Sequence, residues 1–217
     1  MKYLHFLAGH YYKMRDASHG YSHIYTVYNL SKIISNKLNI INKKDLLIIK
    51  CSALFHDVWD NKYISNEKEV ISLKKELRED LKRINLSDSN IDDIYTIIDN
   101  ISFTKEYNLN KLGEILYLGE LNLLRDIVSD ADKISSLGRE GIIRMFIYEY
   151  SLDKEKDIDD YILIIKKLYH NRFVPLINNN YIKTTYGKIL AKPLIFEMRE
   201  IIYNDSIMLE LANTYCN

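Results

Sequence analysis

The chain has 217 residues, of which 47% are hydrophobic and 28% charged, and its formal net charge is zero. This length and composition are those of one globular domain with its own core, and the balanced charge predicts neither a nucleic-acid nor a membrane partner. No apolar stretch approaches the roughly 20 residues that a membrane helix needs. Cys51 lies in an apolar run and Cys216 in a tail, which argues against a disulfide framework. We therefore expect a cytoplasmic protein.

Apolar residues recur at helical spacing along most of the chain, and the alternation typical of strands is hard to find. A loop is expected after residue 57, and Gly138 and Gly141 bracket an expected break. The segment 44–57 is almost completely apolar, which indicates a helix at the centre of a bundle. The sequence therefore predicts an all-α, single-domain helical bundle. Its expected helices span about 3–14, 22–38, 44–57, 66–84, 90–103, 114–136, 142–152, 161–177 and 185–203.

One pair of residues suggests a metal-binding site. His56 and Asp57 stand side by side at the end of the apolar segment, and neighbours on a helix point roughly 100° apart, so both can bind one ion from different directions. His23 opens the preceding helix, and Asp130 and Asp132 lie near the end of a later one. Histidines and aspartates from three helices would form a mixed nitrogen and oxygen site suited to Mn²⁺, Fe²⁺ or Mg²⁺.

Five ordered segments strengthen this interpretation. They are DASHGYSHIYTV, LFHDVWDNKY, IIDNISF, IVSDADKISSLGREGIIR and KTTYGKILA, and they run from Asp16 to Ala191. Together they resemble the HD-domain metal-dependent phosphohydrolases, most closely the small single-domain bacterial HD proteins, some of which are nucleotide pyrophosphohydrolases. The resemblance implies one HD domain over residues 1–217. Its metal-site core would span about 16–150, with C-terminal helices at about 157–210 packing on it.

The resemblance also implies which aspartate binds the metal. In this superfamily the last metal-binding Asp usually follows Ala and precedes a variable and an apolar residue, which selects Asp132 over Asp130. Asp130 would then orient a ligand from outside the coordination sphere. One divalent ion is expected, Mn²⁺ first, with Mg²⁺, Fe²⁺, Ni²⁺ and Co²⁺ as alternatives. The implied ligands are His23, His56, Asp57 and Asp132.

Other polar residues receive roles from the same resemblance. Asp60 matches a catalytic carboxylate, so we expect it to orient or deprotonate the attacking water. Lys62 and Lys133 are candidates for binding phosphate oxygens. Arg144 and His170 match polar family positions and are expected to contact substrate.

Several local alternatives stay open beside these roles. Arg144 could instead pair with Glu140 at i,i+4. His19 lies in a plausible approach to the site and is expected to support it from outside the coordination sphere, or else only to cap or brace the helix of His23. Trp59 could stack on a base or simply fill the wall. The bacterial relatives tend to carry a lysine where Val174 stands here, so a substrate contact of the family could be lost.

The sequence therefore predicts a divalent-metal-dependent phosphohydrolase that converts (d)NTP to (d)NMP and pyrophosphate. A nucleoside 5′-monophosphate phosphatase or another phosphoester hydrolase is the alternative within the same enzyme class. A catalytically silent nucleotide-binding HD protein, or a helical interaction module without metal, are alternatives from other classes. The expected partner is a small-molecule nucleotide, and the expected assembly is a monomer or a homodimer.

Overall fold

A computed structural model describes residues 2–13, 20–60, 64 and 66–216. Over these residues the chain forms helices joined by turns and contains no strand, so the predicted all-α fold is confirmed. The helices are α1 (Lys2–Tyr11), α2 (Tyr21–Lys37), α3 (Lys43–Phe55), α4 (Glu67–Lys82), α5 (Asp88–Ile98), α6 (Phe103–Lys111), η1 (Gly119–Leu121), α7 (Asn122–Ser135), α8 (Gly138–Leu152), α9 (Ile158–Leu168), η2 (Tyr169–Phe173), α10 (Val174–Asn178), α11 (Thr185–Ile202) and α12 (Asp205–Tyr215).

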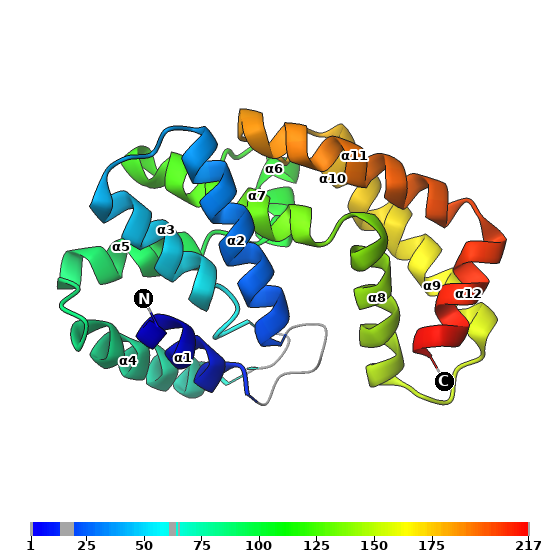
Figure 1. The fold of residues 1–217 in the computed structure, drawn as a ribbon, viewed down its shortest axis with the longest axis horizontal. Helices are drawn as coiled ribbons and strands as arrows, with labels where there is room; N and C mark the ends of the chain where they lie inside the picture. Colours follow the sequence, from blue (N-terminus) through cyan, green and yellow to red (C-terminus); the bar gives the residue numbers. More distant parts are fainter. Residues whose placement is uncertain (1, 14–19, 61–63, 65, 217) are drawn as a thin grey trace.

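Three helices form the centre of the N-terminal half. α2 packs against both α3 and α7, and α3 also contacts α7, α5 and α1 (Figure 1). α3 is buried without interruption from Ile48 to Phe55, as its apolar sequence predicts. α2 instead buries one stripe, which includes Ile24, Val27, Ser31 and Ile34 at helical spacing. Because α2, α3 and α7 pack against one another, the ends of these three helices are held in fixed positions relative to one another.

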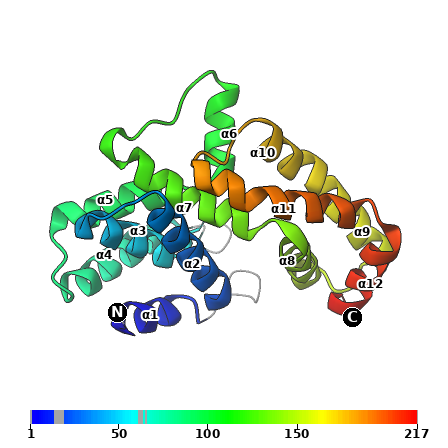
Figure 2. The same ribbon diagram turned by 45° about the horizontal axis from the view of Figure 1, so that its top comes forward.

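The C-terminal helices pack beside this centre. α11 is long and contacts α7, α8 and α12, so it joins the two halves of the molecule (Figures 1 and 2). The chain turns from α7 into α8 at Gly138, whose φ is +69°. A Cβ there would lie 2.5 Å from Glu197 Oε2, the end of a flexible side chain that can move, so it is the backbone conformation that favours glycine. α8 begins at this glycine rather than after the break expected near residue 141.

Two helices, α6 and α12, were not predicted from the sequence because their hydrophobic patterns are weak. α6 buries only Phe103 and Glu106, so it has no apolar period. α12 is short, and it buries Met208, Leu211 and Ala212. It packs on α8 and α9, so the residue after it, Cys216, is buried rather than part of a free tail.

Two other helical segments differ from the prediction in where they begin or in whether they are continuous. The helix expected over 114–136 begins at residue 122, and Ile115 and Tyr117 before it are 86% and 74% exposed. The segment expected as one helix over 161–177 runs through a π-helical turn at Tyr169–Phe173. A π-helical turn changes the direction of the side chains that follow it relative to a regular helix.

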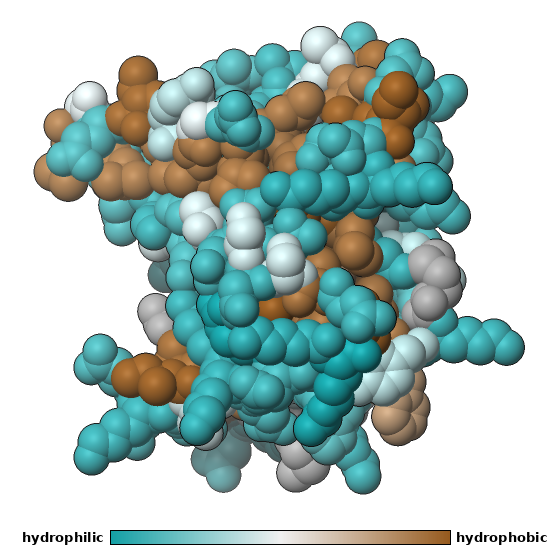
Figure 3. Space-filling view, turned by 90° about the vertical axis from the view of Figure 1, so that its left-hand side faces the viewer, coloured by the Kyte–Doolittle hydropathy of each residue, from teal (hydrophilic) through white to brown (hydrophobic). Residues whose placement is uncertain are grey.

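The surface near α4 and α5 is mostly polar. Of the 16 residues of α4, only Leu77, Asp80 and Leu81 are buried. This side of the molecule is hydrophilic over most of its area, and hydrophobic residues gather toward its upper edge (Figure 3). In the described part of the chain, no helix combines the length and the apolar character needed to cross a membrane.

Candidate metal centre

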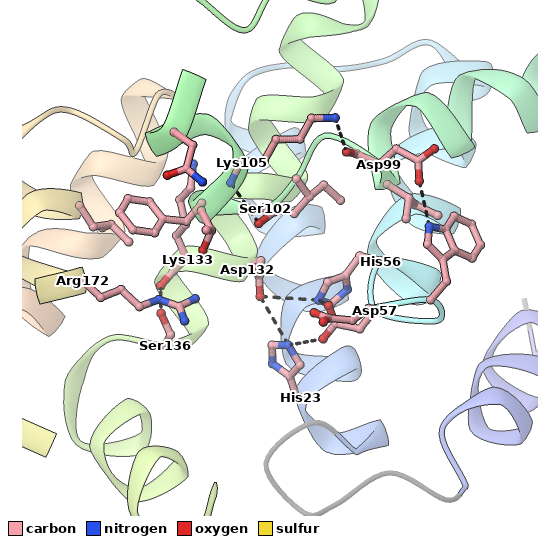
Figure 4. Close-up of a pocket in the computed structure, with 18 of the residues that line it drawn as sticks. His23, His56, Asp57, Asp99, Ser102, Lys105, Asp132, Lys133, Ser136 and Arg172 are labelled. Carbon is pink, nitrogen blue, oxygen red and sulfur yellow. Dashed lines mark hydrogen bonds and ion pairs between the residues drawn. The ribbon is translucent and has the colours of Figure 1, made fainter. Parts of the chain in front are cut away.

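Four side chains from three helices meet at one point (Figure 4). His23 lies in the first turn of α2, His56 and Asp57 directly follow α3, and Asp132 lies in α7. His23 Nε2 is 3.6 Å from Asp57 Oδ2 and 3.4 Å from Asp132 Oδ1. His56 Nε2 is 3.4 Å from Asp57 Oδ1 and 3.6 Å from Asp132 Oδ1. Each imidazole therefore faces both carboxylates.

Local structure holds the corner formed by His56 and Asp57. His56 ends α3 with helical backbone angles, and its Nδ1 lies 2.9 Å from the carbonyl oxygen of Ala53 one turn earlier. The backbone N–H of Asp57 donates to the hydroxyl of Tyr12 at 3.2 Å. Because the carbonyl of Ala53 can only accept, a neutral His56 carries its hydrogen on Nδ1 and has a free lone pair on Nε2.

The charges at this point are strongly coupled. Burial alone would lower the pKa of His56, but the carboxylates of Asp57 and Asp132 outweigh it and raise this pKa to about 9. Burial alone would raise the pKa of Asp57, but the His56 and His23 rings hold it below its usual range. The pKa of Asp132 is lowered for the same reason. Two ionised carboxylates thus face two imidazoles and favour a positive charge between them.

The same residues satisfy the requirements of a divalent ion. His56 Nε2 is buried and has no hydrogen-bond partner among the residues that the structure describes. Single atoms of His23, His56 and Asp57 lie within 4.8 Å of one another. Ligands about 2.0–2.2 Å from one ion lie roughly 3.0–3.5 Å apart, close to the separations observed here. Imidazole nitrogen and carboxylate oxygen suit Mn²⁺, Fe²⁺, Zn²⁺ and related ions.

Asp130 differs from the expectation. Its Oδ1 accepts from the backbone N–H of Lys183 at 2.8 Å, and its Oδ2 accepts from the N–H and hydroxyl of Thr184, both at 2.7 Å. A Cβ at Gly187 would lie 2.6 Å from Asp130 Oδ2, so the carboxylate sits against the start of α11. Asp130 therefore anchors α11 to α7 rather than orienting a metal ligand.

A cavity of about 630 Å³ opens beside the four converging side chains. The lining of the cavity includes Asp60, for which the resemblance implies a catalytic carboxylate. The side chain of Asp60 is half-buried. A turn brings Asp60 there rather than a continued helix, since α3 ends at Phe55 and the N–H of Asp60 donates to the carbonyl of Asp57 at 3.2 Å. The cations that line the cavity are Lys105, Lys133, Arg144 and Arg172.

Lys133 lines the cavity but also has a structural role. It is 3% exposed, and its Nζ donates to Glu106 Oε2 at 3.0 Å and to the carbonyl of Tyr181 at 2.8 Å. Glu106 also accepts from Arg125 at 2.9 Å. An ammonium group has three donors, and these two contacts account for two of them.

The remaining predicted site residues lie in different places relative to the cavity. Arg144 lines the cavity, and its NH1 lies 3.4 Å from both the carbonyl and the hydroxyl oxygen of Ser135. His170 is exposed and does not line the cavity; its ring lies against Tyr169 and Tyr203, so the structure does not bring it together with the other predicted contacts. Lys62 and His19 lie outside the described residues.

Two cationic residues of the cavity lining were not predicted. Lys105 lies two residues after the segment IIDNISF, and its Nζ donates to the carbonyl of Asp99 at 3.0 Å. Arg172 lies two residues after His170 in the π-helical turn, and its guanidinium is 6.0 Å from the centre of the Phe103 ring. The proximity of Lys105 to a recognised motif was a usable signal, whereas nothing in the sequence indicates the π-helical turn.

Polar contacts of Trp59 hold the cavity wall next to Asp60 in place. Trp59 is 8% exposed and donates from Nε1 to Asp99 Oδ1 at 2.9 Å. The ammonium of Lys74 lies 4.8 Å from the Trp59 ring centre and also binds the Asp99 carboxylate. Trp59 is thus fixed in the cavity wall, in line with the expectation that it fills the wall.

Comparisons with known proteins agree with this geometry. The HD-domain family model matches residues 20–137. A Bacillus subtilis protein called uncharacterized protein YpgQ is 28% identical over 133 residues, which is 61% of this chain and 58% of that protein. The matched region thus spans less than two thirds of this relative.

Solved structures show the same fold. A Lactobacillus plantarum protein superposes with a TM-score of 0.71 at 21% identity, covering 98% of this chain and 96% of that one. Bacillus subtilis YpgQ in complex with ADP superposes with a TM-score of 0.65 at 19% identity, covering 93% of each chain. The chain belongs to the HD-domain family, whose members are typically metal-dependent phosphohydrolases.

Proposed function

We propose that this protein is a divalent-metal-dependent phosphohydrolase that acts on nucleotides and converts (d)NTP to (d)NMP and pyrophosphate. One observation carries the proposal. The converging His23, His56, Asp57 and Asp132 lie at the edge of a cavity whose other walls present cations. Phosphate oxygens bound in such a cavity would lie beside the proposed metal centre.

The metal role falls to the four converging residues. His23 and His56 would hold the ion through Nε2, and Asp57 and Asp132 through carboxylate oxygens. When bound, the ion supplies a Lewis acid that polarises a phosphoryl oxygen. Mn²⁺ suits this donor set, as do other divalent ions of similar chemistry.

The protein's own residues supply the other requirements of hydrolysis. Asp60 lines the cavity beside Asp57, and in the proposal its carboxylate accepts a hydrogen bond from the attacking water and removes its proton. Lys105 and Arg172 bind non-bridging phosphate oxygens from the opposite walls. Lys133 adds its third donor. These cations would offset the charge that develops on the leaving pyrophosphate.

Three observations support a nucleotide rather than a smaller phosphate ester. The cavity of about 630 Å³ falls within the size range of sites for molecules of this class. Its lining also includes apolar side chains, among them Ile98, Ile101 and Phe103, against which a base would pack. The relative Bacillus subtilis YpgQ has been solved in complex with ADP.

The test is a panel of nucleoside mono-, di- and triphosphates with Mn²⁺, in which orthophosphate and pyrophosphate are measured separately. Wild-type protein should release pyrophosphate from triphosphates. Asp57→Ala should release none, whereas Asp159→Ala, an exposed carboxylate on α9, should match wild type. Pyrophosphate release that survives in Asp57→Ala, or no product from any nucleotide, would contradict the proposal.

A further inference from the structure

Ser135 occupies an unusual position beside the metal centre. It is the last residue of α7, one turn after Asp132, and it is 9% exposed. Its hydroxyl oxygen lies 3.4 Å from His23 Nδ1, the ring nitrogen that faces away from the two carboxylates. Ser135 thus touches one candidate ligand through its side chain and belongs to the same helix as another.

The hydrogen of this hydroxyl group already has a partner. Ser135 Oγ donates to the carbonyl oxygen of Asp132 at 2.7 Å, a much shorter contact than the one to His23. A serine hydroxyl has one hydrogen and two lone pairs, so toward His23 the oxygen acts as an acceptor. His23 therefore donates from Nδ1.

Arg144 favours the same arrangement. Its NH1 lies 3.4 Å from Ser135 Oγ and 3.4 Å from the Ser135 carbonyl oxygen. A guanidinium group only donates, so it occupies an acceptor position of the hydroxyl and favours the orientation in which the hydrogen points to Asp132. Arg144 acts here through Ser135.

The consequence appears at the other nitrogen of the ring. A neutral imidazole with its hydrogen on Nδ1 has a lone pair on Nε2, and His23 Nε2 faces Asp57 and Asp132. His56 reaches the same state through the carbonyl of Ala53. With the opposite tautomer, the Nε2 hydrogen of His23 would point at these carboxylates and block an ion.

We propose that Ser135 is a positioning residue that fixes His23 in its Nδ1–H tautomer and so prepares Nε2 to bind a divalent ion. The inference rests on the metal role within the proposed function and is independent of the substrate. It also gives Arg144 a role that needs no direct contact with a nucleotide.

Nuclear magnetic resonance of ¹⁵N-histidine-labelled, metal-free protein at alkaline pH tests the tautomer directly. Wild-type His23 should show a protonated Nδ1 and an unprotonated Nε2. Ser135→Ala should shift His23 toward the Nε2–H form and leave His56 unchanged. Ser136→Ala is the matched control, because Ser136 donates to the carbonyl three residues earlier in the same way, at 2.6 Å to Lys133.

Calorimetric titration with Mn²⁺, without nucleotide, supplies the second measurement. Ser135→Ala should weaken binding by about 10-fold, the lower end of the effect of removing a hydrogen-bond partner of a metal-binding histidine. Ser136→Ala should bind as wild type does. An Nε2–H signature for wild-type His23 would overturn the proposal, even if Ser135→Ala does not fold. An unchanged tautomer in Ser135→Ala, or equal losses in both variants, would overturn it as well. None of these outcomes depends on nucleotide hydrolysis.

Discussion

Asp130 and Asp132 lie two residues apart on α7 and face different surroundings. Asp130 is fully buried and binds Thr184 at the start of α11, whereas Asp132 is half-buried and faces His23 and His56. Residues at this spacing project from different sides of a helix. α7 therefore carries a structural carboxylate on one side and a candidate ligand on the other.

Substitution should separate these two roles. Asp130→Ala leaves the backbone N–H groups of Lys183 and Thr184 without their acceptor, so the free energy of unfolding should fall by roughly 3 kcal/mol in urea titrations. Asp132→Asn should unfold at nearly the wild-type urea concentration and yet lose Mn²⁺ affinity by about 100-fold or more, because it removes a ligand rather than an outer partner. Equal stability losses in the two variants would contradict this division.

The ion cluster around Glu106 should stabilise the fold above acidic pH. Burial alone would raise the pKa of Glu106, but Lys133 and Arg125 outweigh it and lower this pKa from 4.5 to about 2. The stabilisation is therefore present above pH 4.5 and is lost as the pH falls toward 2. It corresponds to about 3 kcal/mol at neutral pH.

Glu106→Gln tests this dependence because it leaves two buried cations without their anion. The variant should be destabilised by about 3–5 kcal/mol near neutral pH. Urea unfolding at a series of pH values should show this difference from wild type shrinking as the pH falls through the window below 4.5. A difference that stays constant with pH would show that the Glu106 carboxylate is not held ionised by its neighbours.

Arg172 and His170 provide a matched pair on one π-helical turn. Arg172 lines the cavity, and His170 lies outside it against Tyr169 and Tyr203. Loss of a charge-assisted hydrogen bond to phosphate should raise KM in Arg172→Gln by about 10-fold or more. His170→Gln should keep the wild-type KM. Steady-state kinetics with the best nucleotide of the panel measures both, and a larger effect in His170→Gln would refute the placement of the phosphate.

Asp60 should affect the chemical step and not the metal. General-base catalysis typically contributes a factor of about 10²–10⁴, so kcat should fall by that factor in Asp60→Asn. Calorimetry should show wild-type Mn²⁺ affinity in the same variant, because Asp60 is absent from the converging ligand atoms. A variant that loses metal binding as well would make Asp60 a ligand rather than a base.

The metal corner could be predicted because its residues occupy ends of strongly patterned helices. The largely apolar run before His56 indicates where α3 ends, and the stripe that starts at Ile24 places His23 in the first turn of α2. The choice between Asp130 and Asp132 came from the resemblance. The contacts of Asp130 with Thr184, 54 residues away, explain its separate role, and no local pattern encodes that distance.

The substrate wall was harder to predict for physical reasons. α6 carries Lys105 into the cavity, but its buried face combines Phe103 with the charged Glu106, so hydrophobic period does not reveal it. Arg172 depends on a π-helical turn, which changes which residue of the segment faces inward. α12 did carry a signal, since Asn204 caps it and accepts from the N–H of Ile207 at 3.2 Å.

The most direct test of the metal centre is anomalous diffraction at the manganese edge from crystals grown with Mn²⁺. The account predicts one strong peak within bonding distance of Nε2 of both His23 and His56 and of oxygens from Asp57 and Asp132. A peak located elsewhere, or no peak among these four side chains in crystals saturated with Mn²⁺, would contradict it.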